Sequence, residues 1–418
     1  MLSENPIRLE ETFTNHNSLE DVSNTTIHYE EFFVKYRRFG KLDWKVSVLG
    51  FGAMRLPLIG GNRENIDEEK ALKMVRYAFD HGVNYIDTAY PYHGGNSESF
   101  VGKALKDGYR EKVKLATKMP IRTVNSRKDL DRIFNEQLNK LQTDYVDFYL
   151  FHGVNKNHWL KMAEINALDW AEKELASGRI GHLGFSFHDT YEVLKEVIDG
   201  YNRWTFCQIQ YNYVDAESKT RSPGTRGLKY AASKGLAVIV MEGIQGGVLA
   251  VKPPQEIQAI WDEAETHRTP AEWALQWLWN QPEISVVLSG MSTMNQVIEN
   301  VESTNRSGPG TLPAEELSLI SRVRSKIFEH GFIGCTNCQY CQPCPQNVAI
   351  PDILALYNEY YTKREDSSTQ QEIIDKYTTS ITPKRGAGLC IKCGECEDKC
   401  PQQLPIRNLL ARATRSFE

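Results

Sequence analysis

The stretch HGVNYIDTAYPYHGGNSE (81–98) decides the fold prediction. It contains a short apolar run, NYID (84–87), that ends in an acidic residue and leads into a segment rich in Gly, Pro and Tyr. Continuous apolar runs of this kind are typical of parallel strands that are covered on both faces. In parallel barrels, polar residues at strand ends are where the chemistry lies. We therefore predict a parallel strand here whose end belongs to a functional site.

Seven more strand candidates lie on either side of this stretch, and helical patterns fit between them. Apolar residues follow Asp67 at helical spacing, and Ser126 with Asp129 resembles a capping box. Eight strand–helix units favour a (β/α)8 TIM barrel over a doubly wound sheet, and no GxGxxG follows any strand. The other strand candidates are KVSVLG (45–50), VKLATK (113–118), VDFYLF (146–151), IGHLGFS (180–186), FCQIQ (206–210), LAVIVM (236–241) and ISVVLS (284–289).

The composition of the chain excludes several function classes. Its 54 acidic and 49 basic residues nearly balance, which gives no support for nucleic acid as a partner. No run of about 18 apolar residues could span a membrane. Residues 1–30 lack the basic start and apolar core of a secretory signal, so we expect a cytoplasmic protein.

Eight of the nine cysteines lie near the C-terminus in two closely spaced runs. The second run, Cys390 to Cys400, has the C-x2-C-x2-C-x3-C-P spacing of bacterial ferredoxins, whereas the first has x2 before its last cysteine. Three cysteines at x2 spacing can ligate one cubane, and the remote fourth ligates the other. We therefore predict two [4Fe-4S] clusters, one on Cys335, Cys338, Cys341 and Cys400 and the other on Cys344, Cys390, Cys393 and Cys396.

Two other interpretations of the cysteines stay open. Eight thiolates could hold two tetrahedral zinc ions, although zinc ribbons usually pair two CxxC knuckles. Disulfides are the third choice in a chain without a signal peptide. The ninth cysteine, Cys207, lies in a strand candidate and is expected to be a core residue.

The chain is thus predicted to have three parts. Residues 1–35 are a polar N-terminal extension that is partly disordered, and residues 36–322 form the barrel. Residues 323–418 contain a connecting helix and a cysteine-rich module, with helices expected at 350–363 and 370–377 between the cysteine runs. The fold class is therefore α/β, a TIM barrel followed by a small, mainly helical [4Fe-4S] ferredoxin-like domain.

Four strand ends carry polar side chains that a purely structural barrel would not need. Asp87 ends one strand and Tyr92 follows it, while Lys118 and His152 end the next two strands. An acid, a phenol, an amine and an imidazole at neighbouring strand ends could converge on one carbonyl oxygen. A fifth end carries Ser186.

Several ordered motifs resemble the aldo/keto reductase family. The resemblance implies that Tyr92 is the general acid, Lys118 favours its phenolate form, Asp87 holds Lys118 charged, and His152 orients the carbonyl. The motifs are YRRFGKLDWKVSVLGFGAMRLP (36–57), GVNYIDTAYPYHGGNSE (82–98), ATK (116–118), YVDFYLFH (145–152), GRIGHLGFS (178–186) and GMSTMNQVIENV (290–301).

The resemblance also implies a site for NAD(P)H, from which the sequence departs. Phe187 stands where the family has an Asn, and Met241 stands where a Tyr usually stacks on the nicotinamide. Gly290 and Gln296 replace basic residues that hold the 2′-phosphate, so preference for NADP should weaken and NAD becomes plausible. The implied cofactor-binding residues are Gly52, Ala53, Met54, Ser186, Gln208, Met241, Gly290, Ser292, Gln296 and Asn300.

Barrel and clusters together predict an oxidoreductase that acts on a carbonyl/alcohol pair or a related small molecule. A hydride carries two electrons and each cluster passes one, so FMN or another flavin could act as a converter, and a ferredoxin-like protein could exchange electrons. Two alternatives stay open. The barrel could be non-catalytic or regulatory, with clusters that relay electrons between protein partners, or the clusters could only stabilise the C-terminus.

Overall fold

The computed structural model describes residues 34–218, 222–362, 367–382 and 384–418. Its centre is the predicted barrel, in which eight parallel strands close in the order β10-β3-β4-β5-β6-β7-β8-β9. The barrel strands are β3 (Leu49–Gly52), β4 (Tyr85–Asp87), β5 (Lys114–Met119), β6 (Val146–Val154), β7 (Ile180–Phe187), β8 (Phe206–Gln210), β9 (Ala237–Met241) and β10 (Ile284–Ser289).

The structure corrects the prediction of one strand over 45–50. β2 (Lys45–Ser47) pairs antiparallel with β1 (Tyr36–Arg38), and the barrel strand β3 begins only at Leu49. The chain changes partner at Val48, whose amide donates to the carbonyl of Lys35 over 2.8 Å. Val46, Val48 and Leu49 are all buried. Because the apolar run continues through all three, the sequence pattern does not show that the run contains two strands, one in the hairpin and one in the barrel.

The β1–β2 hairpin closes the amino-terminal end of the barrel. Phe39, at the hairpin tip, is fully buried and lies 4.7 Å from Phe148 and 5.8 Å from Phe206, ring centre to ring centre. Tyr85 also packs on it, at 6.2 Å. These aromatic rings fill the end of the barrel that lies opposite the carboxyl ends of the strands.

We expect Phe39→Ala to lower the free energy of unfolding by about 3–5 kcal/mol, because the cavity left between the aromatic rings cannot refill. Urea denaturation of the chain measures the effect. Ile59→Ala, which shortens an exposed side chain (59% exposed), is the matched control and should change stability little. Equal losses for the two variants would contradict the role given to the hairpin.

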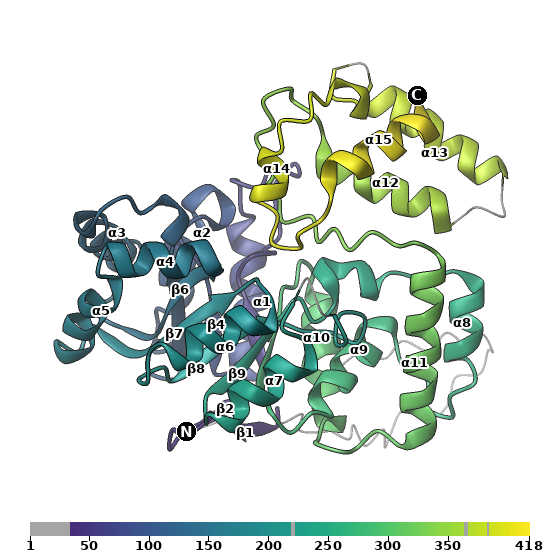
Figure 1. Cartoon of the computed structure of the whole chain (residues 1–418). Helices are drawn as coiled ribbons and strands as arrows, with labels where there is room; N and C mark the ends of the chain where they lie inside the picture. The colour runs from purple at the N-terminus through teal and green to yellow at the C-terminus, as the bar shows by residue number, and fades with distance from the viewer. Residues whose placement is uncertain (1–33, 219–221, 363–366, 383) are drawn as a thin grey trace, which may run out of the picture.

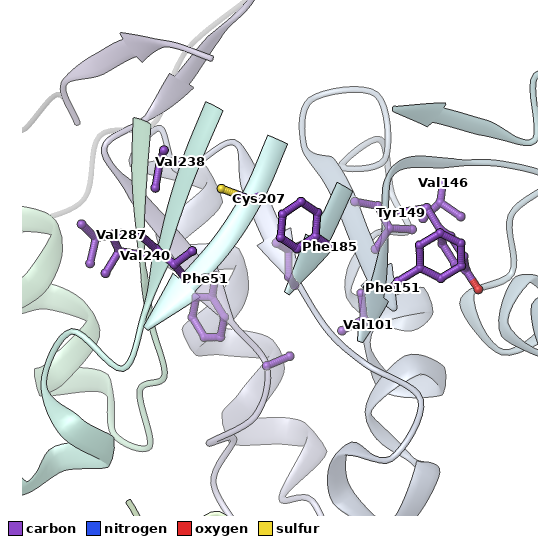
Figure 2. Close-up of a cluster of buried hydrophobic side chains, with 14 of the residues drawn as sticks. Phe51, Val101, Val146, Tyr149, Phe151, Phe185, Cys207, Val238, Val240 and Val287 are labelled. Atoms are coloured by element: carbon purple, nitrogen blue, oxygen red, sulfur yellow. The ribbon is translucent and has the colours of Figure 1, made fainter. Parts of the chain in front are cut away.

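Helices surround the barrel, and the first and third begin as their sequences predict. The side chain of Asp67 caps α1, and Ser126 with Asp129 forms the predicted capping box of α3. Figure 2 shows the core between strands and helices, with Phe51, Phe185, Val238 and the fully buried Cys207. The helices are α1 (Glu68–Asp80), α2 (Ser97–Ala104), α3 (Arg127–Leu141), α4 (Lys156–Glu164), α5 (Ala167–Ala176), α6 (Tyr191–Asp199), α7 (Gly224–Ser233), α8 (Gln255–Trp261), α9 (Pro270–Trp279), α10 (Met294–Ser303) and α11 (Ala314–Glu329).

The C-terminal module is helical, as predicted, and has a core of its own. α12 (Ile350–Thr362) and α13 (Ser367–Ser380) match the two predicted helices, whereas α15 (Ile406–Phe417) was not predicted. Its buried side chains include Tyr357, Tyr377 and Phe417. The cysteine-bearing loops also contain a short helix, α14 (Glu395–Asp398).

The module and the β1–β2 hairpin lie at opposite ends of the barrel, with the module (light green to yellow) above it in Figure 1.

The predicted boundary at 322 falls within α11, and this division of the chain stays a prediction. The predicted extension 1–35 lies outside the described residues except for Val34 and Lys35. No helix within the described ranges is long and apolar enough to cross a membrane.

Candidate active site

The ends of β4 and β5 bring an acid and an amine together inside the barrel mouth. The two strands are neighbours, with Asp87 opposite Ala116 in register. The ammonium of Lys118 lies 2.5 Å from Asp87 Oδ1 and also donates to the carbonyl of Thr88 over 2.7 Å. Lys118 is fully buried and Asp87 is 3% exposed, so the ion pair is shielded from water.

Burial acts on the two charges of this pair in opposite directions. It raises the pKa of Asp87 and lowers the pKa of Lys118, and in each case the charge of the partner opposes the shift. A lone charge at this depth would be costly, because neither water nor a counterion would replace the partner. The pair therefore exists as a unit, and each residue is needed to keep the other charged.

Tyr92 and His152 lie beside the ion pair. The ring of Tyr92 is centred 5.1 Å from the ammonium of Lys118, and the imidazole of His152 meets it nearly edge-on at 5.9 Å between ring centres. His152 lies where the register of β6 against β7 shifts, between Phe151 and Val154. Irregularities of this kind re-aim side chains beside functional sites.

The backbone after β4 is turned sharply to present Tyr92. Tyr92 starts the short helix η1 (Tyr92–Gly95), in which His93 and Gly94 have positive φ angles of 52° and 62°. The His93 imidazole anchors this turn through Nδ1, 2.9 Å from the carbonyl of Arg63. A residue other than Gly at positive φ is strained, which is common where a loop must hold one conformation.

Both Tyr92 and His152 are electrically neutral near pH 7. Burial, then nearby Tyr340 and Asp87, raise the pKa of Tyr92 well above its usual range. Burial, then Lys118, lower the pKa of His152 well below its usual range. The phenol thus keeps its proton and can donate it, and the imidazole is available for a neutral hydrogen bond. The guanidinium of Arg55 opposes this rise in the pKa of Tyr92.

The inner cofactor-binding residues expected from the resemblance lie close together at the strand ends. Ser186 accepts a hydrogen bond from the amide of Gly153 at 2.8 Å, and Gln208 donates to the sulfur of Met241 at 3.3 Å. The other amide atom of Gln208, Oε1, is buried and has no hydrogen-bond partner among the described residues. This free acceptor suits a carboxamide such as that of nicotinamide. Phe187 is fully buried and packs in the core.

The outer cofactor-binding residues lie around the start of α10. Ser292 donates to the carbonyl of Arg55 over 2.8 Å, and its own amide is capped by the side chain of Gln296. A Cβ on Gly290 would lie 2.7 Å from the side chain of Arg55, so the glycine makes room for that arginine. Asn300 donates to Ser289 over 3.0 Å. At this helix start the backbone amides of Ser292 and Gln296 are therefore already satisfied by side chains of the chain itself.

Three residues of this set come from the end of β3. Gly52 pairs with Asp87 in the barrel, and the amide of Ala53 donates to the carbonyl of Asp87 over 2.8 Å. Met54 follows them and lines the large cleft at the barrel mouth. Gly52 and Ala53 therefore support the backbone of Asp87, while Met54 faces the space where ligands can enter.

A cleft of about 2120 Å³ separates the barrel mouth from the module and holds Tyr92 and His152 in its wall. Residues of the module line it as well, among them Tyr340 from the first cysteine run. The Tyr340 ring lies 6.5 Å from that of His152, and the guanidinium of Arg122 lies 5.8 Å from the Tyr340 ring centre. The sequence analysis did not identify Tyr340 or Arg122.

Hydrogen bonds hold the module to the strand ends. Arg55 donates to the carbonyl of Thr336, and Arg63 donates to the carbonyl of Asn337 over 2.5 Å. Gln402, which follows the last cysteine, is 5% exposed and accepts from the Gln210 amide over 2.7 Å. These contacts insert the module's loops between the loops that follow the barrel strands.

The eight cysteines gather in two groups that combine both runs. Burial, then Cys338, Cys335 and Cys400, raise the pKa of Cys341 to about 12, so these four thiols lie near one another. The other group surrounds a small cavity that is lined by Cys344, Cys390, Cys393 and Cys396, and also by Cys341. All eight are free thiols. Two sets of four sulfur donors suit two [4Fe-4S] clusters, and the crossed ligand assignment stays a prediction.

Comparisons with known proteins divide the chain in the same way. Residues 48–323 match the aldo/keto reductase family, and residues 334–404 match a 4Fe-4S dicluster domain. The chain is 29% identical to L-galactose dehydrogenase of Arabidopsis thaliana over 70% of its own length and 95% of that protein. It is 35% identical to the aldo-keto reductase YhdN of Bacillus subtilis over 56% of its length and 69% of that protein.

A solved structure gives the same result. The aldo-keto reductase AKR11C1 from Bacillus halodurans, in its holo form, is 29% identical and superposes with a TM-score of 0.57. The match covers 69% of this chain and 96% of that one. The family match over residues 48–323 and the closed eight-stranded barrel both identify the family of the chain. It belongs to the aldo/keto reductase family of oxidoreductases and carries a 4Fe-4S dicluster domain after its barrel.

Proposed function

We propose that the barrel interconverts a small carbonyl compound and its alcohol, with Tyr92 as general acid and base. The observation that carries this proposal is the buried ion pair of Lys118 and Asp87 beside the Tyr92 ring, 2.5 Å between charged atoms and 5.1 Å from the ammonium to the ring centre. A packing tyrosine needs no buried ammonium beside it.

Each residue of the site has a distinct part. Tyr92 donates its phenolic proton to the carbonyl oxygen as the carbon is reduced, and takes a proton back in the oxidative direction. His152, kept neutral by burial and by Lys118, hydrogen bonds the same oxygen and orients it. Lys118 stabilises negative charge that develops on the Tyr92 oxygen, and Asp87 keeps Lys118 charged and fixed. General acid catalysis of this kind contributes about 10²–10⁴-fold.

The site takes its reducing equivalents from a cofactor of one of two classes, NAD(P)H or a flavin such as FMN. When bound, either cofactor supplies hydride transfer, and a flavin can also exchange single electrons with [4Fe-4S] clusters. Gln208, with its unpaired acceptor, and Ser186 would hold the ring amide, and Met241 would contact the ring face. Since neither Gly290 nor Gln296 carries a positive charge, the preference for NADP over NAD should be weak.

The cysteine module holds two [4Fe-4S] clusters in the crossed arrangement and supplies one-electron carriers beside the barrel site. The first cysteine group lies close to the reaction centre, because Tyr340 stands between Cys338 and Cys341 in the chain and contacts His152. A ferredoxin-like protein is the partner class that this module suits.

The crossed ligand sets predict which serine variants share a phenotype. We expect Cys400→Ser to perturb the same electron paramagnetic resonance signal as Cys341→Ser, and Cys344→Ser to perturb the signal that Cys396→Ser perturbs. Cys207→Ser is the control outside the module. If Cys400→Ser instead altered the signal of the Cys396 group alone, each run would hold its own cluster and the crossed assignment would be wrong.

The proposed function is tested on protein purified without oxygen. Iron and sulfide analysis, the absorption spectrum and identification of released small molecules establish what the chain holds. Turnover of an aldehyde is then measured with NADH, NADPH and reduced FMN. We expect iron and sulfide in equal amounts and turnover with at least one donor. A cluster-loaded protein that reduces no aldehyde with any of the three donors contradicts the proposal.

A further inference from the structure

Arg122 differs from the other cations that line the cleft at the barrel mouth. Arg55 and Arg63 donate to carbonyls of the module, as described above. The other cations that line the cleft have carboxylate partners within 4.0 Å, namely Lys70, Lys73, Lys140, Arg385 and Lys399. Within the described parts of the chain, Arg122 has neither a carboxylate nor a carbonyl partner for its guanidinium.

Within the described residues, the contact of this guanidinium is with an aromatic face. It lies 5.8 Å from the ring centre of Tyr340, at a distance typical of cation–π contacts. A stacked guanidinium is restrained in position while its N–H groups remain free at the edge. This arrangement is typical of arginines that bind a carboxylate through two parallel hydrogen bonds.

The charges around Arg122 favour an anion on this side of the cleft. The imidazoles of His158 and His188 line the same cleft, and burial lowers the pKa of His158 and lowers that of His188 to about 4. Both are therefore neutral near pH 7. The carboxylate of Asp189 already accepts from the backbone amides of Lys156 and Thr190, over 3.0 and 2.7 Å. Within the described residues, Arg122 thus has no carboxylate within 4.0 Å, and a ligand anion can take that place.

Tyr340 connects this cation to the reaction centre. Its ring lies 6.5 Å from the ring of His152 and 5.8 Å from the guanidinium of Arg122, and the ring of His152 lies 5.9 Å from that of Tyr92. A ligand whose carbonyl lies at Tyr92 and His152 can therefore reach Arg122 by extending along the Tyr340 ring.

We propose that Arg122 and Tyr340 form an anion subsite, so that the substrate is a carbonyl compound, or its alcohol, that carries a carboxylate remote from the reacting carbon. The inference rests on the function proposed above and names its substrate class. It also gives the cysteine module a second part in the site: Tyr340, between Cys338 and Cys341, forms one wall of the substrate pocket.

Direct binding tests the subsite without turnover. The probes are 4-carboxybenzaldehyde and its methyl ester, which have the same shape near the aldehyde and differ in charge. Calorimetry on the cluster-loaded chain gives both dissociation constants. A charged hydrogen-bond pair should make the acid bind about 10–100-fold more tightly than the ester. Equal affinities, or no binding of either compound, overturn the subsite.

Variants assign the preference to particular side chains. Arg122→Gln should bring the two affinities together, and Arg122→Lys should retain part of the difference. The matched control is Arg226→Gln, since Arg226 also stacks on a tyrosine, Tyr191 at 4.1 Å, and does not line the cleft. A preference for the acid that survives Arg122→Gln overturns the assignment.

The part of Tyr340 is tested in the same way, with the cluster absorption recorded for each variant. Tyr340→Phe should keep the preference for the acid, because the ring remains, whereas Tyr340→Leu should reduce it at unchanged cluster content. An unchanged preference in Tyr340→Leu removes Tyr340 from the subsite. These experiments measure binding and not turnover, so they can contradict the subsite without contradicting the proposed function. The proposed function is contradicted if turnover persists without the Tyr92 hydroxyl.

Discussion

Tyr92→Phe is expected to lower kcat/KM for aldehyde reduction by about 10²–10⁴-fold while the dissociation constant of the aldehyde changes little. The variant removes one oxygen from a buried side chain and leaves its ring against His152 and Lys118. The loss should therefore fall on the proton-transfer step. Steady-state kinetics with the donor that supports the wild-type chain, combined with calorimetry of aldehyde binding, separates the two effects.

Tyr90→Phe is the control for this variant. Tyr90 lies two residues earlier and lines the same cleft, but its hydroxyl donates to Glu136 over 3.0 Å. It should retain near-normal turnover. If Tyr92→Phe turned over as fast as Tyr90→Phe, Tyr92 would be a packing residue and the non-catalytic interpretation of the barrel would gain.

The second large effect is expected for Lys118→Met, which should abolish turnover and lower the free energy of unfolding by about 3–5 kcal/mol. The substitution leaves the Asp87 carboxylate buried without its counterion, and Asp87 Oδ2 already lacks a hydrogen-bond partner among the described residues. Urea denaturation measures the loss of stability. Asp87→Asn combined with Lys118→Met removes both charges and should recover most of the stability, but none of the activity.

The same variant gives a prediction for pH with a definite sign. Burial raises the pKa of Asp87 in the folded chain, so the carboxylate is less favourable in the folded state than in the unfolded state. Without Lys118 this effect is unopposed. The stability difference between wild type and Lys118→Met should therefore shrink as the pH falls toward about 4, where the acid is protonated in the unfolded chain as well. A difference that is independent of pH would show that the lost stability has another cause.

Sequence patterns predicted the barrel well, because most of its strands are continuous apolar runs and each such run forms one strand of the barrel. The exception, 45–50, shows the limit: Val46 packs beneath the barrel and Leu49 within it, and both environments are equally apolar. The helix α15 was missed although its buried residues Leu409, Leu410 and Ala413 follow a helical spacing.

The site was predictable only where the contributing residues follow one another along the barrel. Asp87, Lys118 and His152 end successive strands, and parallel strands bring their ends together. Tyr340 and Gln402 come from a separate module, and nothing in local sequence shows which module loop meets which strand end. One signal was present for Arg122, since it follows the strand that contains Lys118 within a few residues.

The central claim is that the barrel site and the cysteine module form one redox unit. The most direct test adds the alcohol of a turned-over aldehyde to the anaerobic, cluster-loaded chain, together with its identified cofactor, and records the cluster absorption. With a flavin bound to split the electron pair of the alcohol, one electron can reach each cluster, and we predict that the clusters bleach in the wild-type chain and do not bleach in Tyr92→Phe. Clusters that stay oxidised in the wild-type chain throughout turnover would contradict the account. The role of the clusters would then be purely structural.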